Sequence, residues 1–453
     1  MGAEMAISGK RIGEHCVIVG AGMGGLAAAA ATAPFFDDVT VLDRDALPIT
    51  ARRRRGVAQD RQLHILLKGG ETFLEELLPG IRDDFSKAGA CRVRHEEDNF
   101  QFERGHLFPQ RDLGYVHLGL SRPAYEWVLR ERVRRLSNVR IHERRSVDHV
   151  DVEEGALVSV SGTADKQRFT ESAHLFVFAT GRNGALAQLL AKAGAGEVPA
   201  TELSIEVNYT TGRFRKAGRY KGDSKQVICF PGPPHSALGL LFPIENDEWL
   251  IALGGRSDEK APTDLEGFRA YAASLPFDAI ADRVSDAEPV EPLSSFRVPT
   301  STWWHYDQFP GLPRKLIPLG DCIASFNPTF GQGMSVAAGH ALALRNSLIR
   351  SVQRESLEDI ASHYFPKALE YTAQAWNTAA ISDLEFPQTQ GVRPDNFDKR
   401  VALVDALRRA ARQHHEVHKL RFEIGNLLSP VSATRDEPFA SLIAAALEGK
   451  PAT

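Results

Sequence analysis

Residues 16–44 constrain the fold more than any other stretch of this chain. They read CVIVGAGMGGLAAAAATAPFFDDVTVLDR. An apolar run leads into a G-x-G-x-x-G turn, an alanine-rich segment follows and stops at Pro34, and a second apolar run ends in Asp43. This order is typical of a βαβ unit in a dinucleotide-binding α/β domain.

Each glycine of the turn has a physical task. Gly20 allows a tight turn, Gly22 lets the backbone approach a pyrophosphate, and Gly25 lets the helix pack close to the strand. The helix N-terminus then presents its N–H groups and positive dipole end to the phosphates. Asp43 is expected to accept hydrogen bonds from a ribose diol.

A second glycine segment lies about 300 residues further on. The buried strand pattern Leu316–Leu319 ends in Gly320 and Asp321, and Gly331-Gln332-Gly333-Met334 precedes a long helix that starts at Ser335. One extended dinucleotide could use both glycine segments. Asp321 would then meet ribityl hydroxyls, and the helix N-terminus would stabilise negative charge on a reduced isoalloxazine.

Composition excludes several classes of protein. The 453 residues are 43% hydrophobic and 25% charged, with a net charge of −4, so neither nucleic acid nor stable membrane insertion is expected. The four cysteines are far apart, which favours a reducing cytoplasm over disulfides or zinc. The first residues contain no apolar signal-peptide core, and we expect a cytoplasmic enzyme.

The basic loop Arg52–Arg55 allows two interpretations. It is either a solvated turn, or one of its arginines contacts a dinucleotide phosphate beside the βαβ turn. Further on, Ser121 is a good N-cap for a helix over 125–136, and 265–274 is predicted as another helix. Residues 156–161 and 167–170 are predicted as a hairpin, and the segments between 203 and 297 as antiparallel strands.

Several motifs together resemble the FAD-dependent monooxygenases of the aromatic-hydroxylase and squalene-epoxidase superfamily. They occur in that family's order from residue 16 to about 345: Val17–Leu26 with Asp43, Ser121-Arg122, Ala179-Thr180-Gly181, and Leu319–Asp321 with Asn327–Met334. The stretch 55–66, followed by Gly69-Gly70-Glu71, is similar to a loop of bacterial polyether-type flavin epoxidases.

The resemblance implies an α/β fold. A Rossmann-like FAD-binding domain with a glutathione-reductase-like βαβ unit would carry an inserted antiparallel β-rich substrate domain and a C-terminal helical region. We expect the FAD-binding domain at 12–90, 120–200 and 298–345, the substrate domain at 91–119 and 201–297, and the helical region at 346–453.

The resemblance also implies a set of FAD contacts. They are Gly20, Gly22, Met23, Gly24, Gly25, Asp43, Arg44, Arg54, Gln59, Arg122, Thr180, Gly181, Gly320, Asp321, Pro328, Gly331, Gln332, Gly333 and Met334. Aromatic hydroxylases usually have an aspartate where this chain has Thr180, and no second G-x-G-x-x-G unit is present. Electrons would therefore come from NADPH or NADH either directly or through a separate flavin reductase.

The expected reaction inserts one oxygen atom from O₂, through a flavin C4a-hydroperoxide, into an apolar natural-product-like substrate. Epoxidation of an alkene or hydroxylation is favoured. The alternatives are a phenol hydroxylase, a flavin-dependent reductase of isoprenoid double bonds, a flavin halogenase, and a non-enzymatic FAD-binding module. We expect the substrate pocket to include Phe230, Phe242, Phe296, Trp304 and Phe330.

No catalytic residue can be assigned from the sequence. His64, His117, His235 and Tyr209 are candidate bases, and each is also a common structural residue. Lys68 is the candidate for the pocket lysine of a halogenase, although the W-x-W-x-I-P motif is absent. His414 and His418 have i, i+4 spacing, but the arginines around them favour a solvated basic helix over a metal site, so no metal is expected.

Overall fold

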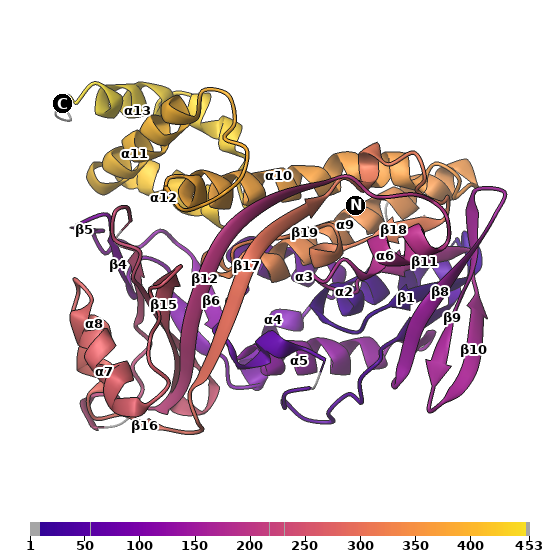
Figure 1. The fold of residues 1–453 in the computed structure, drawn as a ribbon, viewed down its shortest axis with the longest axis horizontal. Helices are drawn as coiled ribbons and strands as arrows, with labels where there is room; N and C mark the ends of the chain where they lie inside the picture. The colour runs from indigo at the N-terminus through magenta and orange to yellow at the C-terminus, as the bar shows by residue number, and fades with distance from the viewer. Residues whose placement is uncertain (1–9, 55, 217, 231, 450–453) are drawn as a thin grey trace.

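The computed structural model describes residues 10–54, 56–216, 218–230 and 232–449 (Figure 1). A parallel sheet in the order β18-β11-β1-β2-β7 carries the N-terminal motif. Its strands are β1 (Gly13–Val19), β2 (Phe36–Leu42), β7 (Val139–His142), β11 (Leu175–Phe178) and β18 (Leu316–Pro318). The chain thus forms the mixed α/β fold that the sequence predicts.

The βαβ unit is confirmed. Strands β1 and β2 pair in parallel around α2 (Met23–Thr32), with Val17 opposite Thr40. Gly20 has φ +109°, and a Cβ there would lie 2.4 Å from the carbonyl oxygen of Ala179. Only glycine can therefore occupy this turn.

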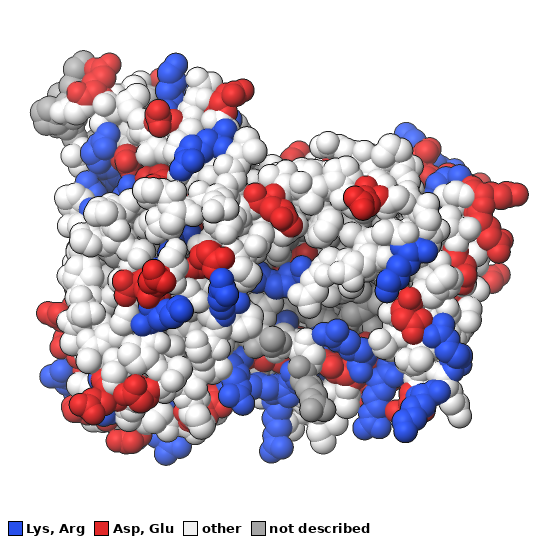
Figure 2. Space-filling model, viewed as in Figure 1, with Lys and Arg blue, Asp and Glu red and all other residues white. Residues whose placement is uncertain are grey.

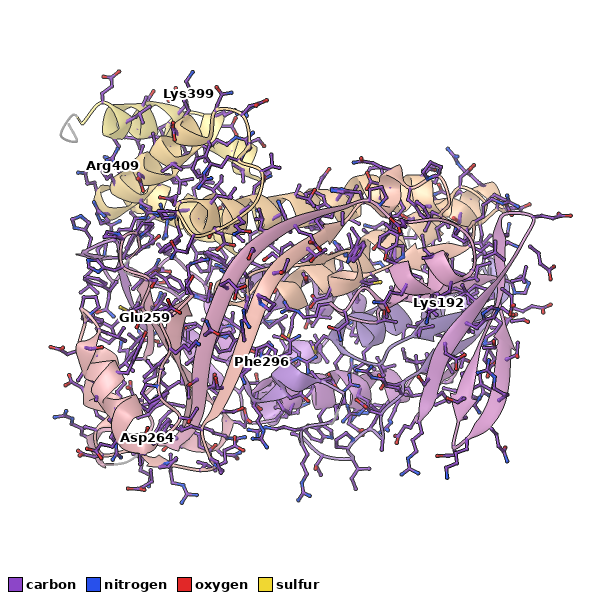
Figure 3. All side chains as sticks on the ribbon, in the orientation of Figure 1. Lys192, Glu259, Asp264, Phe296, Lys399 and Arg409 are labelled. Carbon is purple, nitrogen blue, oxygen red and sulfur yellow. The ribbon has the colours of Figure 1, made fainter. Side chains whose placement is uncertain are left out.

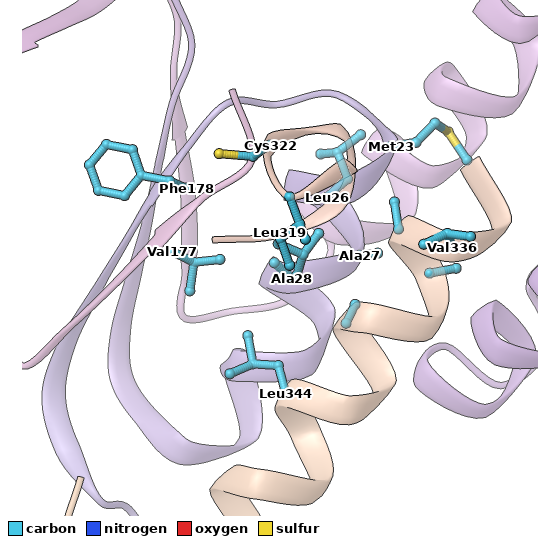
Figure 4. Close-up of a cluster of buried hydrophobic side chains, with 14 of the residues drawn as sticks. Met23, Leu26, Ala27, Ala28, Val177, Phe178, Leu319, Cys322, Val336 and Leu344 are labelled. Atoms are coloured by element: carbon cyan, nitrogen blue, oxygen red, sulfur yellow. The ribbon is translucent and has the colours of Figure 1, made fainter. Parts of the chain in front are cut away.

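Helices cover the parallel sheet. α9 (Gly333–Arg354) packs against α2, against α3 (Lys68–Leu77) and against α10 (Ile360–Leu384). Figure 4 shows α2, with Leu26, Ala27 and Ala28 labelled, running alongside α9, with Val336 and Leu344 labelled. These side chains are buried, and the small alanines let the two helices approach closely.

The remaining elements of this half surround the same sheet. They are α4 (Ile81–Lys87), α5 (Arg122–Arg134), α6 (Ala185–Lys192) and the sheet of β8 (Arg145–Glu153), β9 (Ala156–Ala164) and β10 (Gln167–Ser172). The short pair of β3 (Cys91–Arg94) and β6 (Val116–Gly119) connects to the other half of the molecule, because β6 contacts both α4 and β14 (Leu238–Ile244). The predicted hairpin is confirmed as the antiparallel pair of β9 and β10.

A second large sheet stands beside the first (Figure 1). Its order is β19-β17-β12-β15-β14-β13-β4-β5, and β16 pairs with β12. The bounds are β4 (Asn99–Glu103), β5 (His106–Leu107), β12 (Ala200–Arg215), β13 (Gln226–Phe230), β14 (Leu238–Ile244), β15 (Glu248–Arg256), β16 (Glu288–Pro289), β17 (Ser294–Trp304) and β19 (Ala324–Ser325). Its pairs are antiparallel except for β13 with β4.

Two groups of helices border this sheet. α7 (Leu265–Ser274), as predicted, and α8 (Ala279–Val284) bury a core that contains Trp249 and Phe268. α11 (Phe397–Gln413), α12 (His415–Gly425) and α13 (Phe439–Leu447) form the C-terminal end, at the upper left of Figure 1. They share a small core of their own.

Two local predictions need correction. Ser121 is the N-cap residue of α5, but its hydroxyl donates to Oε1 of Glu245 at 2.6 Å rather than capping the helix. The helix is interrupted at His414, between α11 and α12, and His418 is buried with Nε2 3.3 Å from Oε2 of Glu96. The predicted solvated helix face is therefore wrong at His418.

Within the described residues, none of the helices combines the length and apolarity needed to cross a bilayer.

Candidate functional site

One cavity of about 380 Å³ opens where β1, β11 and β18 end. It brings together every residue that the sequence assigns to the cofactor except Gly25: Gly20, Gly22, Met23, Gly24, Asp43, Arg44, Arg54, Gln59, Arg122, Thr180, Gly181, Gly320, Asp321, Pro328, Gly331, Gln332, Gly333 and Met334. The two glycine segments, so far apart in sequence, are thus walls of the same space.

The glycines beside this cavity differ in what surrounds them. A Cβ on Gly25 would lie 1.7 Å from the carbonyl oxygen of Gly20, so Gly25 supports the close approach of helix and strand from behind the cavity. A Cβ on Gly22 would meet only Nη2 of Arg54, at 3.4 Å. Gly22 is the N-cap of α2, so the first-turn N–H groups begin at the cavity wall, which suits an anionic ligand.

Asp43 is buried at the end of β2 and is already held in place. Its Oδ2 accepts a hydrogen bond from the backbone N–H of Ala21 at 2.7 Å, and its Oδ1 accepts one from the N–H of Asp45 at 2.9 Å. Arg54 donates to both carboxylate oxygens. The protein's own N–H groups and Arg54 therefore orient the acid that the sequence assigns to a ribose.

Arg54 is the arginine of the basic loop that reaches the cavity. Its guanidinium also bonds Oδ2 of Asp45 at 3.0 Å and Oε1 of Glu126 at 2.7 Å, and its side chain is 6% exposed. Burial alone would lower the pKa of Arg54, but the charges of Glu126 and Asp43 outweigh it and raise the pKa. Arg52 is exposed, Arg53 pairs with Glu291, and Arg55 lies outside the described residues.

Arg122 continues this charged wall. It pairs with Asp60 and with Oε2 of Glu126, the latter at 3.2 Å. Burial raises the pKa of Asp60 despite the charge of Arg122. Figure 2 shows a hollow near the middle of the molecule, with Lys and Arg side chains gathered beside it. A cavity wall rich in arginine favours ligands that carry phosphate.

The far end of the cavity contains Arg182, which the sequence analysis missed. Its Nη2 donates to the carbonyl oxygen of Phe326 at 3.1 Å, and its Nε lies 3.9 Å from Oδ2 of Asp321. Burial raises the pKa of Asp321, although Arg182 and Arg122 oppose that shift. The signal was its place directly after Thr180-Gly181, at the end of a buried strand.

His64 lines this cavity as a neutral imidazole. Its Nδ1 lies 2.9 Å from the carbonyl oxygen of Gln62, which assigns the proton to that nitrogen. Burial, helped by the charge of Arg122, lowers the pKa of His64 to about 3. His64 is consequently a hydrogen-bond acceptor at neutral pH and a weak base.

The other candidate bases lie elsewhere. His117 has Nδ1 3.2 Å from Glu71, and Tyr209 is buried with its ring 5.9 Å from that of Phe296. Burial raises the pKa of Tyr209. Of His117, Tyr209 and His235, only His235 lines one of the two described cavities, and that is the smaller one.

The predicted aromatic pocket is divided. Phe296, on β17 in the middle of Figure 3, lines the large cavity. Phe230 and Phe330, whose ring centroids are 6.3 Å apart, line a second cavity of about 80 Å³. In the part of the chain that the structure describes, Phe242 is buried on β14 and Trp304 packs on Gly184, and neither lines a described cavity.

The small cavity is partly built by the C-terminal helices, which the sequence did not indicate. Ser382 and Phe386, at and just beyond the end of α10, line it together with Arg408 of α11. Arg408 donates to Oε1 of Glu103 at 2.6 Å, a contact between residues 305 positions apart. Arg104 and Arg256 also line this space, so it combines aromatic rings with three guanidinium groups.

A short loop separates the two cavities. Asn327, Pro328 and Gly331 line the large one, whereas Thr329 and Phe330 line the small one. Consecutive residues of one turn therefore face both spaces.

Lys68 is engaged elsewhere. Its Nζ lies 2.8 Å from Oε2 of Glu71 and 2.9 Å from the carbonyl oxygen of Val116. Among the described residues that line the two cavities there is no lysine. Within the same described ranges, no group of three or more His, Cys, Asp or Glu side chains has the arrangement of a metal site.

Comparison with known proteins places this site in context. No protein-family model matches the sequence. The chain has 16% identity to p-nitrophenol 4-monooxygenase PnpA from Pseudomonas putida DLL-E4, with a TM-score of 0.63 over 92% of this chain and 98% of that one. It has 13% identity to the flavin-dependent brominase Bmp2, with a TM-score of 0.65 over 96% and 98%. These likenesses show the fold of FAD-binding, flavin-dependent enzymes.

A sequence relative is closer. Protein Rv3254 of Mycobacterium tuberculosis (strain ATCC 25618 / H37Rv) is 32% identical over 396 residues, which cover 82% of this chain and 81% of that protein. The chain therefore belongs to the family of protein Rv3254, and its fold is the one that PnpA and Bmp2 share.

Proposed function

We propose that this chain is an FAD-dependent monooxygenase. The observation that carries the proposal is that both glycine segments line a single cavity: Gly20 and Gly22–Gly24 from the first, and Gly331–Met334 from the second. An extended dinucleotide needs such a pair of sites, since a mononucleotide would use only the first.

The residues present fit FAD. The N-terminus of α2 and Gly22 would hold the pyrophosphate, and Asp43 with Arg54 would hold the adenosine ribose. Asp321 and the N-terminus of α9, which begins at Gly333, would hold the far end. When bound and reduced, the flavin supplies the chemistry that activates O₂.

The chain's own residues supply binding and orientation. His64 offers a neutral acceptor to the large cavity, and Arg182 fixes the loop at Phe326. Electrons would come from NADPH or NADH, directly or through a flavin reductase. The proposed FAD-binding part comprises residues 12–90, 120–200 and 298–345, and the β-rich part the intervening segments.

The proposed substrate is an apolar natural-product-like molecule, oxidised by epoxidation or hydroxylation. It would lie between Phe296 and the rings of Phe230 and Phe330. One observation favours phenol hydroxylation as a second candidate: Arg104, Arg256 and Arg408 offer donors for oxygen atoms on an aromatic ring. The engaged Lys68 disfavours halogenation.

The test begins with flavin loading. Wild-type protein should retain FAD, and Gly22→Val should fold but lose it, because a side chain there enters the cavity without striking the backbone. Oxidation of a candidate substrate under ¹⁸O₂ should then place one ¹⁸O atom in the product. Wild-type protein that binds no FAD, or product oxygen derived from water, would contradict the proposal.

A further inference from the structure

We propose that Asp383 is a positioning residue that holds the loop between the two cavities. This role rests on the proposed function in one respect, namely that the large cavity binds FAD. Asp383 lies near the end of α10, is fully buried, and lines neither cavity in the described part of the chain. It would act through the residues that it binds.

The first of these residues is Asn327. Its Nδ2 donates to Oδ1 of Asp383 at 2.7 Å, and Asn327 is itself fully buried. Its Oδ1 accepts hydrogen bonds from the backbone N–H of Thr329 at 3.1 Å and from the Thr329 hydroxyl at 2.8 Å. The amide is therefore fully oriented, with its oxygen on the loop and its nitrogen on the helix.

This orientation matters because the loop has two faces. Pro328 lines the large cavity, and Thr329 and Phe330 line the small one. A rotation of Asn327 would move both walls together. Asp383 is the group that opposes this rotation, since it holds the end of the amide that points away from the loop.

The second residue is Arg256 of β15. Its Nη2 forms an ion pair with Oδ1 of the same carboxylate, and its guanidinium lies 4.4 Å from the ring centroid of Phe386. Arg256 and Phe386 both line the small cavity. Oδ1 of Asp383 thus holds the loop beside the large cavity and also orients the Arg256 guanidinium at the small cavity.

This arrangement leaves the Asp383 carboxylate only partly satisfied. Its Oδ2 is buried and has no hydrogen-bond partner among the described residues. A buried acid that leaves one oxygen unsatisfied is destabilising by itself, so packing does not explain the choice of residue. A single oxygen that must accept from both Asn327 and Arg256 does explain it.

The test is Asp383→Ala in the full-length protein, with hydrogen exchange measured by mass spectrometry. Alanine has no acceptor, so Asn327, whose Oδ1 accepts from Thr329, is no longer held from α10. We expect faster exchange in peptides that cover 326–334, with little change in peptides from α7. This readout does not require FAD. Unchanged exchange at 326–334 in a folded variant would overturn the proposal.

Flavin readouts then test the link to the cofactor. In the Asp383 variant, the dissociation constant of FAD should rise about tenfold, as expected when the charge-assisted contact between Asn327 and Asp383 is lost. The visible spectrum of the bound flavin should also shift. The matched control is Asp98→Ala, which removes a buried carboxylate bonded to Arg94 and Lys225 away from both cavities. It should lower stability and leave exchange at 326–334 and flavin binding unchanged.

Two further outcomes remain distinct. If Asp383→Ala does not fold, Asp383→Ser keeps a polar group at the buried position but is too short to reach Nδ2 of Asn327, and it leaves the Asn327 oxygen that accepts from Thr329 in place. It should give the same faster local exchange, and wild-type exchange at 329–331 would refute the role. If wild-type protein binds no FAD, the proposed function fails, while the exchange result still decides the role of Asp383.

Discussion

Nη1 of Arg54 lies 3.1 Å from both carboxylate oxygens of Asp43. This contact joins the basic loop to the end of β2, and Glu126 holds the same guanidinium from α5. The adenosine end of the proposed cofactor site is therefore built from three separate chain segments.

Arg54→Ala should be strongly destabilising. The change leaves Asp43, Asp45 and Glu126 without their shared cation, and breaking a buried pair from one side costs about 3–5 kcal/mol. Urea unfolding at pH 7 measures the loss. Arg53→Ala, which removes a more exposed pair with Glu291 from the same loop, should cost about 1 kcal/mol or less. Equal losses in the two variants would show that the Arg54 network contributes no more than a surface pair.

Gly25→Ala should prevent stable folding of the βαβ unit. The new methyl group would lie 1.7 Å from the carbonyl oxygen of Gly20, so α2 must move away from β1. Gly22→Ala is the matched control, because its methyl group meets only the end of Arg54. Thermal unfolding of the cofactor-free proteins should show a large loss for Gly25→Ala and a small one for Gly22→Ala. A normal melting temperature for Gly25→Ala would contradict the close approach of α2.

Glu71 should make the protein sensitive to acid. Burial alone would raise its pKa, but the hydrogen bond and charge of His117, together with Lys68, lower the pKa of Glu71 to about 2. Because this value is below the unfolded value of 4.5, the carboxylate stabilises the fold above pH 4.5, and that contribution is lost as the pH falls from 4.5 towards 2.

Glu71→Gln should therefore be less stable at pH 7 and should lose less stability across that acid range. Denaturant unfolding at several pH values between 2 and 7 measures both effects. Glu76→Gln removes a more exposed carboxylate of the same helix, which pairs with Arg345, and is the matched control for the loss of one charge. A parallel loss in Glu71→Gln and wild type below pH 4.5 would assign the acid sensitivity to other groups.

Phe330→Trp should impair substrate binding and spare the cofactor. The larger ring would fill a cavity of only about 80 Å³, whereas the cofactor would contact Pro328 and Gly331 of the same loop. For a substrate identified by product analysis, KM should rise while FAD affinity stays at the wild-type value. Phe242→Leu should change neither, since Phe242 is buried away from both cavities. An unchanged KM in Phe330→Trp would remove the small cavity from the substrate site.

The sequence predicts those features that depend on neighbouring residues. The βαβ unit and α7 follow from local periodicity, turn glycines and caps, and the structure confirms them. It could also predict that Gly20 and Gly331 line one cavity, because an extended dinucleotide would use both glycine segments.

Features that depend on distant packing could not be predicted. The sequence around Arg408 gives no sign that this residue will contact Glu103. The sequence around Phe242 does not distinguish an aromatic ring in the core from one that lines a substrate pocket. Ser121 has the right place for a cap, yet a buried carboxylate from Glu245 competes successfully for its hydroxyl.

The position of β18 in the parallel sheet has a consequence for synthesis of the chain. β11 is entirely apolar and buried, and its outer edge is covered only by β18, which emerges from the ribosome some 140 residues later. Until then, Leu175–Phe178 is an open, hydrophobic strand edge of the kind that recruits other chains. A nascent chain halted before Leu316 would accordingly be prone to aggregate, even though its βαβ unit is complete.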